Sequence, residues 1–322
     1  MQGDSHQKVS ILIPSYNHSA FIEQTIRSIW EQDYPNLELV IVDDGSTDNS
    51  REVIARLKAI SPITMIVVEQ ENAGICRTLN RALAQSTGQI IGILASDDTM
   101  LPDRLNQEVR WFESEPSLNV LFSNGHFLSE GRIFGDAHKK IKPFLRRGIV
   151  AMRNLVLSKA TGCYIQAMLI RRDFLMTLGG FDEETGSDDW SLNIRIFQAL
   201  QLEREFLFLD RYAFLYRVHE MQMHRAGEFM TPMKRKVVRK YFSLENRSKF
   251  ICQNYVRKAF GLLLQRRFKL SGHYLTKARY IGFSEGFPLA CLMRFGFDFP
   301  GFAYRELMRR LKRPYRYWWS QG

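Results

Sequence analysis

The sequence predicts an α/β fold, with a mixed, mainly parallel β-sheet flanked by helices, followed by a basic, mainly helical C-terminal extension. Short β-branched runs alternate with amphipathic segments over the first 100 residues, which is typical of βαβ units. Polar motifs follow several of these runs, at the points where strands would end. Because ligands of open α/β sheets bind at that edge, we expect the functional site there.

Four buried strands are expected in the first part of the chain, at residues 9–13, 37–42, 63–68 and 90–94. Each run is short, apolar and rich in β-branched residues. Helices are predicted between them. The first is indicated by Ile22, Ile26 and Ile29, which share one helical face, and the next two are expected around 53–57 and over 74–84.

The pattern is less regular beyond Pro102. A helix is expected after this proline as far as Ser114, and another over 187–200. Further strands are predicted at 120–123, 164–170, 206–209 and 212–218. Residues 130–150 are polar and basic, and fit no element clearly.

Charge is distributed unevenly along the chain. The formal net charge is +11, yet residues 230–322 contain 21 Lys and Arg against four acidic residues, a local net charge of +17 that leaves −6 for residues 1–229. The composition also changes near residue 228. We therefore predict one domain at 1–228 and a basic, aromatic-rich helical extension at 229–322.

Two interpretations of this extension stay open. It could form a helical subdomain with a solvated basic face. Alternatively, its Lys, Arg, Trp and Tyr side chains could attach the protein peripherally to an anionic membrane surface. Nucleic-acid binding is disfavoured, because the sequence contains no recognised nucleic-acid-binding module.

Other sequence features favour a cytoplasmic protein. No apolar run reaches the roughly 18 to 20 residues that span a bilayer, and the N-terminus lacks the apolar stretch of a signal peptide. Cys76, Cys163, Cys252 and Cys291 are scattered, and match neither a zinc spacing nor a disulfide framework. Reduced thiols, and a location in the cytoplasm or at the inner face of the plasma membrane, are expected.

Two adjacent carboxylates follow the predicted strand at 37–42. Asp43 and Asp44 begin the run Asp-Asp-Gly-Ser-Thr-Asp, which ends at Asp48. At the carboxyl edge of a sheet, such carboxylates could accept hydrogen bonds from a nucleobase or ribose, or could hold a metal. An Asx turn in which Asp48 caps the next helix is the structural alternative.

A second pair, Asp97 and Asp98, follows the predicted strand at 90–94. Adjacent carboxylates next to a buried strand are costly unless they are paired or bound to a metal. Hard divalent cations such as Mg²⁺ and Mn²⁺ prefer oxygen ligands, often shared with substrate phosphates. A helix N-cap by Asp98 or Thr99 is the alternative.

Three weaker motifs complete the set. They are Pro-Ser-Tyr-Asn at 14–17, Gly-Gly-Phe-Asp-Glu at 179–183 followed by Asp-Asp-Trp at 188–190, and Tyr-Arg-Val-His at 216–219. Each has a simple structural explanation by itself: a turn, acidic residues in the first turn of a helix, or a surface histidine.

In this order the motifs resemble those of glycosyltransferase family 2, on a Rossmann-like GT-A fold. The resemblance also includes Asn-Ala-Gly at 72–74 with Asn80, and Thr-Gly at 87–88, and it covers roughly residues 8–224. It implies inverting transfer of a sugar from a nucleoside-diphosphate sugar, with UDP as the expected nucleotide, to a hydroxyl of a glycan or lipid-linked acceptor. Surface polysaccharide or oligosaccharide biosynthesis, and Mn²⁺ or Mg²⁺ as cofactor, are implied as well.

The resemblance divides the domain into a nucleotide-sugar-binding half at 8–105 and an acceptor and catalytic-base half at 106–228. It implies that Asp44 binds the base, with Asp43 in support. The residues implied to contact the nucleotide or donor sugar are Pro14, Tyr16, Asp43, Asp44, Asn72, Arg77 and Asp97.

The remaining implied roles concern the metal and the chemistry. Asp98 and His219 would hold the cation, and Asp97 would contact the ribose or donor sugar. Asp189 would be the catalytic base, with Trp190 beside it in a supporting role.

Two departures from the family pattern are visible. Asp188, a supporting residue, stands where Glu is usual. The usual Ala-Arg-Asn reads Thr-Leu-Asn at 78–80, so a phosphate contact would have to come from Arg77 or Arg81.

The non-enzymatic alternative is a catalytically degenerate GT-A fold that serves as a sugar-nucleotide-binding or scaffold subunit. The clustered carboxylates of Asp44, Asp97, Asp98 and Asp189 favour the enzyme, because a scaffold does not require them.

Overall fold

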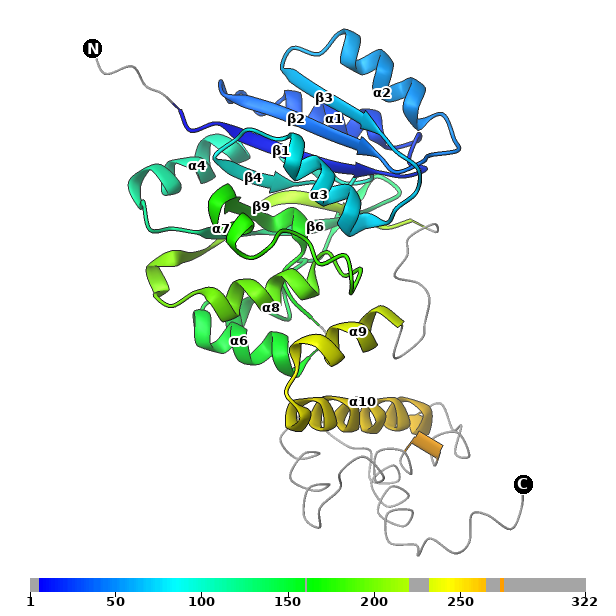
Figure 1. Ribbon diagram of the computed structural model, residues 1–322, viewed down its shortest axis with the longest axis vertical. Coiled ribbons are helices and arrows are strands. Elements are labelled where there is room, and N and C mark those ends of the chain that lie inside the picture. The colour runs from blue at the N-terminus through cyan, green and yellow to red at the C-terminus, as the bar shows by residue number, and fades with distance from the viewer. Residues whose placement is uncertain (1–5, 160, 220–231, 265–272, 275–322) are drawn as a thin grey trace, which may run out of the picture. The chain divides into compact units, whose positions relative to one another are not determined.

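A computed structural model describes residues 6–159, 161–219, 232–264 and 273–274 (Figure 1). The chain divides into two compact units. The first consists of residues 1–227 with 232–237, and the second of residues 228–231 with 238–322.

The described part of the first unit forms a nine-stranded sheet in the order β3-β2-β1-β4-β8-β6-β9-β5, with β7 paired to β6 outside this path. The strands are β1 Val9–Ser15, β2 Leu37–Asp43, β3 Thr64–Glu69, β4 Ile90–Ile93, β5 Thr99–Met100, β6 Val120–Ser129, β7 Arg132–Phe134, β8 Met168–Arg171 and β9 Phe206–Arg217. Strands β3, β2, β1 and β4 run parallel, and β9 runs parallel to β6. The pairs β4–β8, β6–β8, β5–β9 and β6–β7 are antiparallel. The predicted mixed α/β sheet is confirmed.

Helices flank this sheet (Figure 1). The helices of the first unit are α1 Ile22–Trp30, α2 Ser50–Ala59, α3 Ile75–Gln85, α4 Arg104–Ser114, α5 Lys142–Leu145, α6 Ile149–Ser158, α7 Arg172–Thr177 and α8 Trp190–Ala199, with 3₁₀ turns η1 Ile165–Ala167 and η2 Glu203–Glu205. The helices predicted from apolar periodicity are all present, within a few residues at each end.

The central strands are buried on both faces. Every residue of β1 and β2 is buried, so successive side chains enter different layers. Ile11 and Ile13 belong to a core cluster that includes Ile26 of α1, together with residues of α2 and α4. Leu79 of α3, which lies against β1 and β2, is buried outside that cluster. Helix α3 therefore covers the other face.

Three predicted strands differ in the structure. The run 164–170 is a strand only over β8, because η1 turns Gln166 into the core, where its carbonyl accepts a hydrogen bond from Arg104 at 2.8 Å. The two strands expected at 206–209 and 212–218 are one strand, β9. Its register against β6 shifts at the point where the sequence pattern breaks.

The second unit is described only in part. Helix α9 (Pro232–Tyr241) ends in it, and α10 (Leu244–Leu264) belongs to it, where Phe242 and Phe250 contact edge to face with ring centroids 5.3 Å apart. None of the helices in the described residues is long and apolar enough to cross a membrane. Most of the expected extension lies outside the described residues, including its Trp- and Tyr-rich end, and the domain boundary near 228 stays a prediction.

Candidate functional site

The loops that follow β1, β2 and β4 are joined by hydrogen bonds at the carboxyl edge of the sheet. Asn17 N donates to Ser46 Oγ at 2.9 Å, and Asn17 Oδ1 accepts from Thr47 N at 2.8 Å. His18 Nδ1 lies 2.7 Å from Ser96 Oγ. Asn17 has a φ of 52°, a left-handed conformation that Asn tolerates better than most residues. The three loops therefore lie together at the edge where the strand pattern predicts the site.

Asp43 organises the turn after β2. Its fully buried carboxylate accepts hydrogen bonds from Ser46 N at 2.8 Å, Ser46 Oγ at 2.6 Å and Arg51 Nε at 2.9 Å. Ser15 Oγ also donates to it, at 3.3 Å. The geometry fits a supporting role, because no face of this carboxylate is open to a ligand.

Asp44 holds the loop that precedes α3. Its carboxylate accepts from Ala73 N at 2.8 Å, Gly74 N at 3.0 Å and Gln70 Nε2 at 2.7 Å, and the residue is 5% exposed. Oδ1 accepts two of these hydrogen bonds, whereas Oδ2 accepts only the one from Gly74 N and has a further lone pair. Asp44 can therefore hold this loop and still accept from a ligand at its exposed edge.

The expected base-binding residues lie around this loop. Pro14 is buried at the end of β1, whereas Tyr16 is 45% exposed, so its ring is open for stacking. Asn72 is exposed and lines a surface hollow of about 480 Å³. The other residues that line it are Gly45, Arg51, Glu69, Gln70 and Glu71.

Helix α3 is tied to the Gly-Gly-Phe-Asp-Glu loop. Asn80 Nδ2 donates to Phe181 O at 2.9 Å, and Phe181 N donates back to Asn80 Oδ1 at 2.8 Å. The exposed Arg77 forms an ion pair with Glu183, with Nε and Oε2 3.2 Å apart. Arg77 is thus positioned at the surface between the two halves of the domain.

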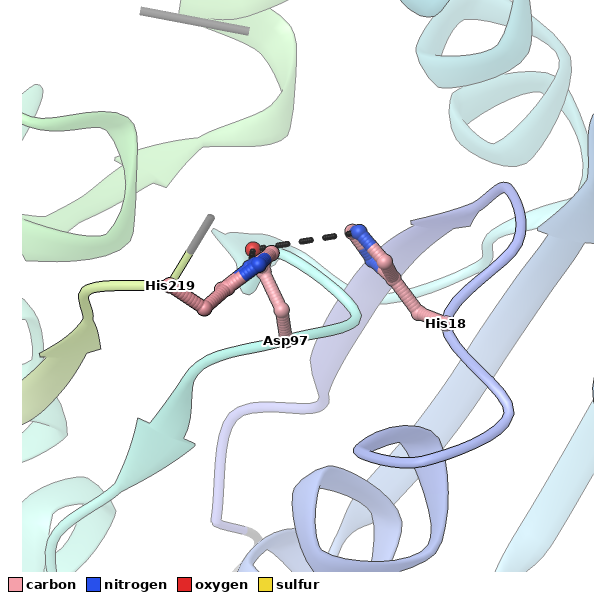
Figure 2. A group of neighbouring side chains, drawn as sticks. All are labelled: His18, Asp97 and His219. Atoms are coloured by element: carbon pink, nitrogen blue, oxygen red, sulfur yellow. Dashed lines mark hydrogen bonds and ion pairs between the residues drawn. The ribbon is translucent and has the colours of Figure 1, made fainter. Parts of the chain in front are cut away.

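Figure 2 shows two histidines directed toward the carboxylate of Asp97, His18 from the loop after β1 and His219 from the segment after β9. His219 Nε2 lies 2.9 Å from Asp97 Oδ2, and His18 Nε2 lies 3.9 Å from the same oxygen. Burial lowers the pKa of His18, against the opposing effect of Asp97. His18 is therefore expected to be neutral near pH 7, as a metal ligand must be.

These three residues fit a divalent cation. One potential ligand atom from each lies within 4.8 Å of the others. Donors about 2.1 Å from a shared ion stand roughly 3 to 4 Å apart, so small movements suffice. His219 Nδ1 is buried, with no hydrogen-bond partner among the described residues. A carboxylate with two imidazoles suits a transition ion such as Mn²⁺ better than Mg²⁺.

The structure places Asp98 differently from our expectation. Its carboxylate is buried in the core, where it accepts from Arg217 N at 2.8 Å and Gln166 Nε2 at 2.5 Å. Burial, and then the neighbouring Asp97, raise its pKa. Asp97, rather than Asp98, lies in the group with the histidines, because the turn after β4 points the second carboxylate inward.

Arg217 holds the segment that carries His219, and sequence reasoning missed it. Arg217 Nε donates to Asp97 O at 2.7 Å, and its Nη2 donates to Gln24 Oε1 at 2.6 Å. Thr25 Oγ1 donates to Asp98 O at 2.7 Å from the other side. Arg217 lies in the Tyr-Arg-Val-His motif, two residues before His219. That position was the sequence feature that could have indicated its role.

Asp189 begins α8 as its N-cap, and its side chain accepts a hydrogen bond from Trp190 N. Trp190 is buried, and its Nε1 donates to Val156 O at 2.9 Å, which anchors the start of the helix. Asp188 is partly exposed. Burial of its carboxyl, and then Asp189, raise its pKa to about 7.

Two neighbouring tyrosines lie between the segments that hold Asp189 and the Asp97–Asp98 turn. Asn193 Nδ2 donates to Asp189 O at 2.8 Å and to the carbonyl that precedes Tyr164 at 3.0 Å, and the backbone N–H that follows Tyr216 donates to Asp98 Oδ1 at 2.8 Å. Burial raises the pKa of Tyr216, and the charges of Asp98, Asp97 and Asp189 add to this effect. Burial also raises the pKa of Tyr164, again with contributions from Asp189 and Asp98. The ring centroids of the two tyrosines are 5.0 Å apart. Carboxylates from both halves of the domain are therefore close to one aromatic pair.

Comparison with known proteins agrees with this architecture. The profile described as Glycosyl transferase family 2 matches residues 10–179, which is more than half of the chain. The "Uncharacterized glycosyltransferase alr2836" of Nostoc sp. is 35% identical over 114 residues, 35% of this chain and 35% of that protein. The chondroitin synthase of Pasteurella multocida is 36% identical over 115 residues, 36% of this chain and 12% of that protein. The matched region thus spans about a third or less of these relatives.

Solved structures share the fold. TarS 1–349 of S. aureus in complex with UDP-GlcNAc has a TM-score of 0.53 at 17% identity, over 85% of this chain and 72% of that one. The mannosyltransferase PcManGT of Pyrobaculum calidifontis in complex with GDP-Man and Mn²⁺ has a TM-score of 0.53 at 20% identity, over 96% and 81%. These similarities confirm the predicted GT-A fold. With the family profile matching more than half of its length, the chain belongs to glycosyltransferase family 2.

Proposed function

We propose that the protein transfers a sugar, with inversion, from a nucleoside-diphosphate sugar to a hydroxyl of a glycan or lipid-linked acceptor, in the assembly of a surface polysaccharide or oligosaccharide. The observation that carries this proposal is that the segments bearing the two groups, the Asp97 cluster with its histidines and Asp189, are held on either side of the Tyr164–Tyr216 ring pair, whose centroids are 5.0 Å apart. A GT-A structure with UDP-GlcNAc and another with GDP-Man and Mn²⁺ support the general class of donor.

The donor nucleotide is proposed to bind along the loops after β1 and β2. Tyr16 offers an exposed ring for stacking, and Asp44 offers acceptor oxygens to a base N–H. Pro14 and Asn72 would line this pocket, and Arg77 would contact a phosphate after leaving Glu183. We propose UDP as the nucleotide, since a carboxylate can accept from the uracil imide.

The cation is proposed to bind Asp97 and His219. When bound, it would supply a Lewis acid and a template for the departing diphosphate. Asp98 is then a positioning residue, because its carboxylate holds the backbone of Arg217 and the side chain of Gln166. This assignment gives Asp97 the cation-binding role that the sequence resemblance implied for Asp98, and leaves Asp98 without a ligand contact.

Asp189 is proposed as the general base. It would take the proton of the acceptor hydroxyl while that oxygen bonds to the anomeric carbon and the bond to the diphosphate breaks. No covalent intermediate with the protein is required. Asp188 is driven toward its protonated form by burial and by Asp189, so the pair carries fewer than two charges near neutral pH.

The first test is a thermal-shift screen against UDP-, GDP-, dTDP- and CMP-sugars, with and without Mn²⁺. We expect a metal-dependent increase in the melting temperature with one nucleotide class, and slow metal-dependent hydrolysis of that donor. Absence of both with every donor would favour the degenerate binding or scaffold fold.

The second test is Asp189→Asn. Because a positioned general base is worth about 10²–10⁴-fold in rate, we expect turnover to fall by that factor. The donor Kd, measured by calorimetry, should stay within about twofold of the wild-type value, since the base contacts the acceptor. Near-normal transfer by this variant would contradict the assignment of Asp189.

A further inference from the structure

His18 approaches the Asp97 carboxylate from a part of the chain that is remote from the other motifs of the cation site. Its Nε2 lies 3.9 Å from Asp97 Oδ2, and its ring stands nearly perpendicular to that of His219, at 88° with centroids 5.8 Å apart (Figure 2). Phe21 is the aromatic neighbour of both histidines, with its ring centroid 6.0 Å from that of His18 and 4.8 Å from that of His219.

The backbone at His18 is held in place by the loop after β2. His18 N donates to Ser50 Oγ at 3.0 Å, and Ser19 N donates to Asp48 Oδ2 at 3.0 Å. Asp48 Oδ1 also accepts from Ser50 N at 3.0 Å, so this carboxylate serves the turn rather than a ligand. A side chain on a loop that is fixed in this way is preorganised for binding.

The side chain of His18 is oriented by Ser96. His18 Nδ1 lies 2.7 Å from the hydroxyl of Ser96, which is buried, and whose carbonyl accepts from Thr25 Oγ1 at 3.0 Å. If Nδ1–H donates to Ser96 Oγ, the lone pair of Nε2 is directed toward Asp97. A metal-bound histidine usually donates its other ring N–H to a neighbouring group, which fixes the orientation of the ring.

From these contacts we propose that His18 is a third protein ligand of the cation site, and that it makes the site select a transition ion such as Mn²⁺ over Mg²⁺. The inference rests on the proposed function in one respect: both assume that a cation binds at Asp97. The physical reason for the selectivity is a difference between the two ions: both accept oxygen ligands, but Mn²⁺, a transition ion, gains more from an imidazole nitrogen than Mg²⁺ does.

The test is a titration of the purified full-length protein with Mn²⁺ alone, in which electron paramagnetic resonance follows the free ion, and Mg²⁺ is then added as competitor. We expect His18→Ala to weaken Mn²⁺ binding by about 10- to 100-fold and to bring the Mn²⁺ and Mg²⁺ affinities closer together. His18→Asp, which supplies oxygen, should restore binding and move the preference toward Mg²⁺. His6→Ala, a change at an exposed histidine outside the group, should leave the Mn²⁺ affinity unchanged.

Asp97→Asn separates failure of this inference from failure of the cation site. If Asp97→Asn loses Mn²⁺ while His18→Ala binds it like the wild type, the inference is wrong and the site stands. If neither variant loses Mn²⁺, or the wild type binds none, both are wrong. Should His18→Ala not fold, Ser96→Ala tests the same contact, and unchanged Mn²⁺ affinity there would equally overturn the inference.

Discussion

Glu38 shows how single residues set the properties of this sheet. Its carboxylate is 1% exposed in β2, yet it accepts from Ser10 Oγ at 2.5 Å, Thr87 N at 2.6 Å and Thr87 Oγ1 at 2.9 Å, and pairs with Lys8 Nζ at 2.6 Å. Burial raises its pKa, but these contacts outweigh burial and lower it from 4.5 to about 2. Asp98, with fewer donors, has a raised pKa instead. At Glu38 the hydrogen bonds and Lys8 outweigh burial, whereas at Asp98 burial and the charge of Asp97 prevail.

The pKa of Glu38 predicts a pH-dependent contribution to stability. A carboxyl with a depressed folded-state pKa stabilises the fold fully above its unfolded value of 4.5, and this contribution is lost as the pH falls toward about 2. We expect Glu38→Gln to lower the free energy of unfolding by roughly 2 kcal/mol near neutral pH, and by much less near pH 2. Urea unfolding across this range would check it. An equal loss at both ends would contradict the ionised state of Glu38.

Asp97 and Asp98 offer a second contrast between neighbouring residues. Asp97→Asn should abolish the stabilisation by Mn²⁺, because it removes the carboxylate between the two histidines. Asp98→Asn should lower the melting temperature but keep Mn²⁺ binding, because this side chain faces Arg217 N and Gln166. Thermal shifts with and without Mn²⁺ would measure both. The opposite pattern would restore the role that the sequence implied for Asp98.

At the scale of elements, a buried ion pair within α4 is hydrogen-bonded to η1 and β6. Arg104 Nε lies 2.9 Å from Glu108 Oε2, and both side chains are at most 1% exposed. Arg104 Nη1 donates to Gln166 O at 2.8 Å, and Ser123 Oγ donates to Glu108. Since Gln166 also contacts Asp98, helix α4 and the turn after β4 share one polar network.

Removing one partner of this pair should be costly. Arg104→Met leaves Glu108 buried without its counter-ion, and we expect a loss of about 3–5 kcal/mol in the free energy of unfolding. Arg104→Met combined with Glu108→Leu should regain most of that loss, because an apolar pair of similar volume needs no desolvated charge. Denaturant unfolding of both variants would measure these free energies. A double variant as unstable as the single one would contradict the prediction, because it would show that the ion pair stabilises the fold more than an apolar pair does.

At the scale of the whole molecule, the GT-A fold does not explain why the positive charge is concentrated in the C-terminal part of the chain. Residues 230–322 carry a net charge of +17, and α9 alone contributes Lys234, Arg235, Lys236, Arg239 and Lys240. Attachment of this region to an anionic membrane at the cytoplasmic face is our proposal from the sequence. It would bring the protein to a lipid-linked acceptor.

Vesicle binding tests that proposal on the full-length chain. We expect sedimentation with vesicles rich in anionic phospholipid and not with neutral ones, because each basic residue near the surface adds about 1 kcal/mol. Binding should fall sharply at about 0.5 M NaCl, where screening shortens the range of the attraction. Equal sedimentation with neutral vesicles would contradict an electrostatic attachment.

Local patterns in the sequence determined the strands, the helices and the family, because period, apolar content and motif order are properties of neighbouring residues. The regular first part of the chain was predicted closely, whereas β5 and β7 depend on pairing with β9 and β6, and α6 on packing against α8, so these elements gave no comparable signal. Only the tertiary structure decided which carboxylate of each pair faces the core. It brought His18 to Asp97 across 79 positions of the chain, and it turned Asp98 toward Gln166. Distances between remote segments depend on how the turns after β1, β4 and β9 are held. Those turns are fixed by partners such as Ser50, Thr25 and Arg217, which no local pattern identifies.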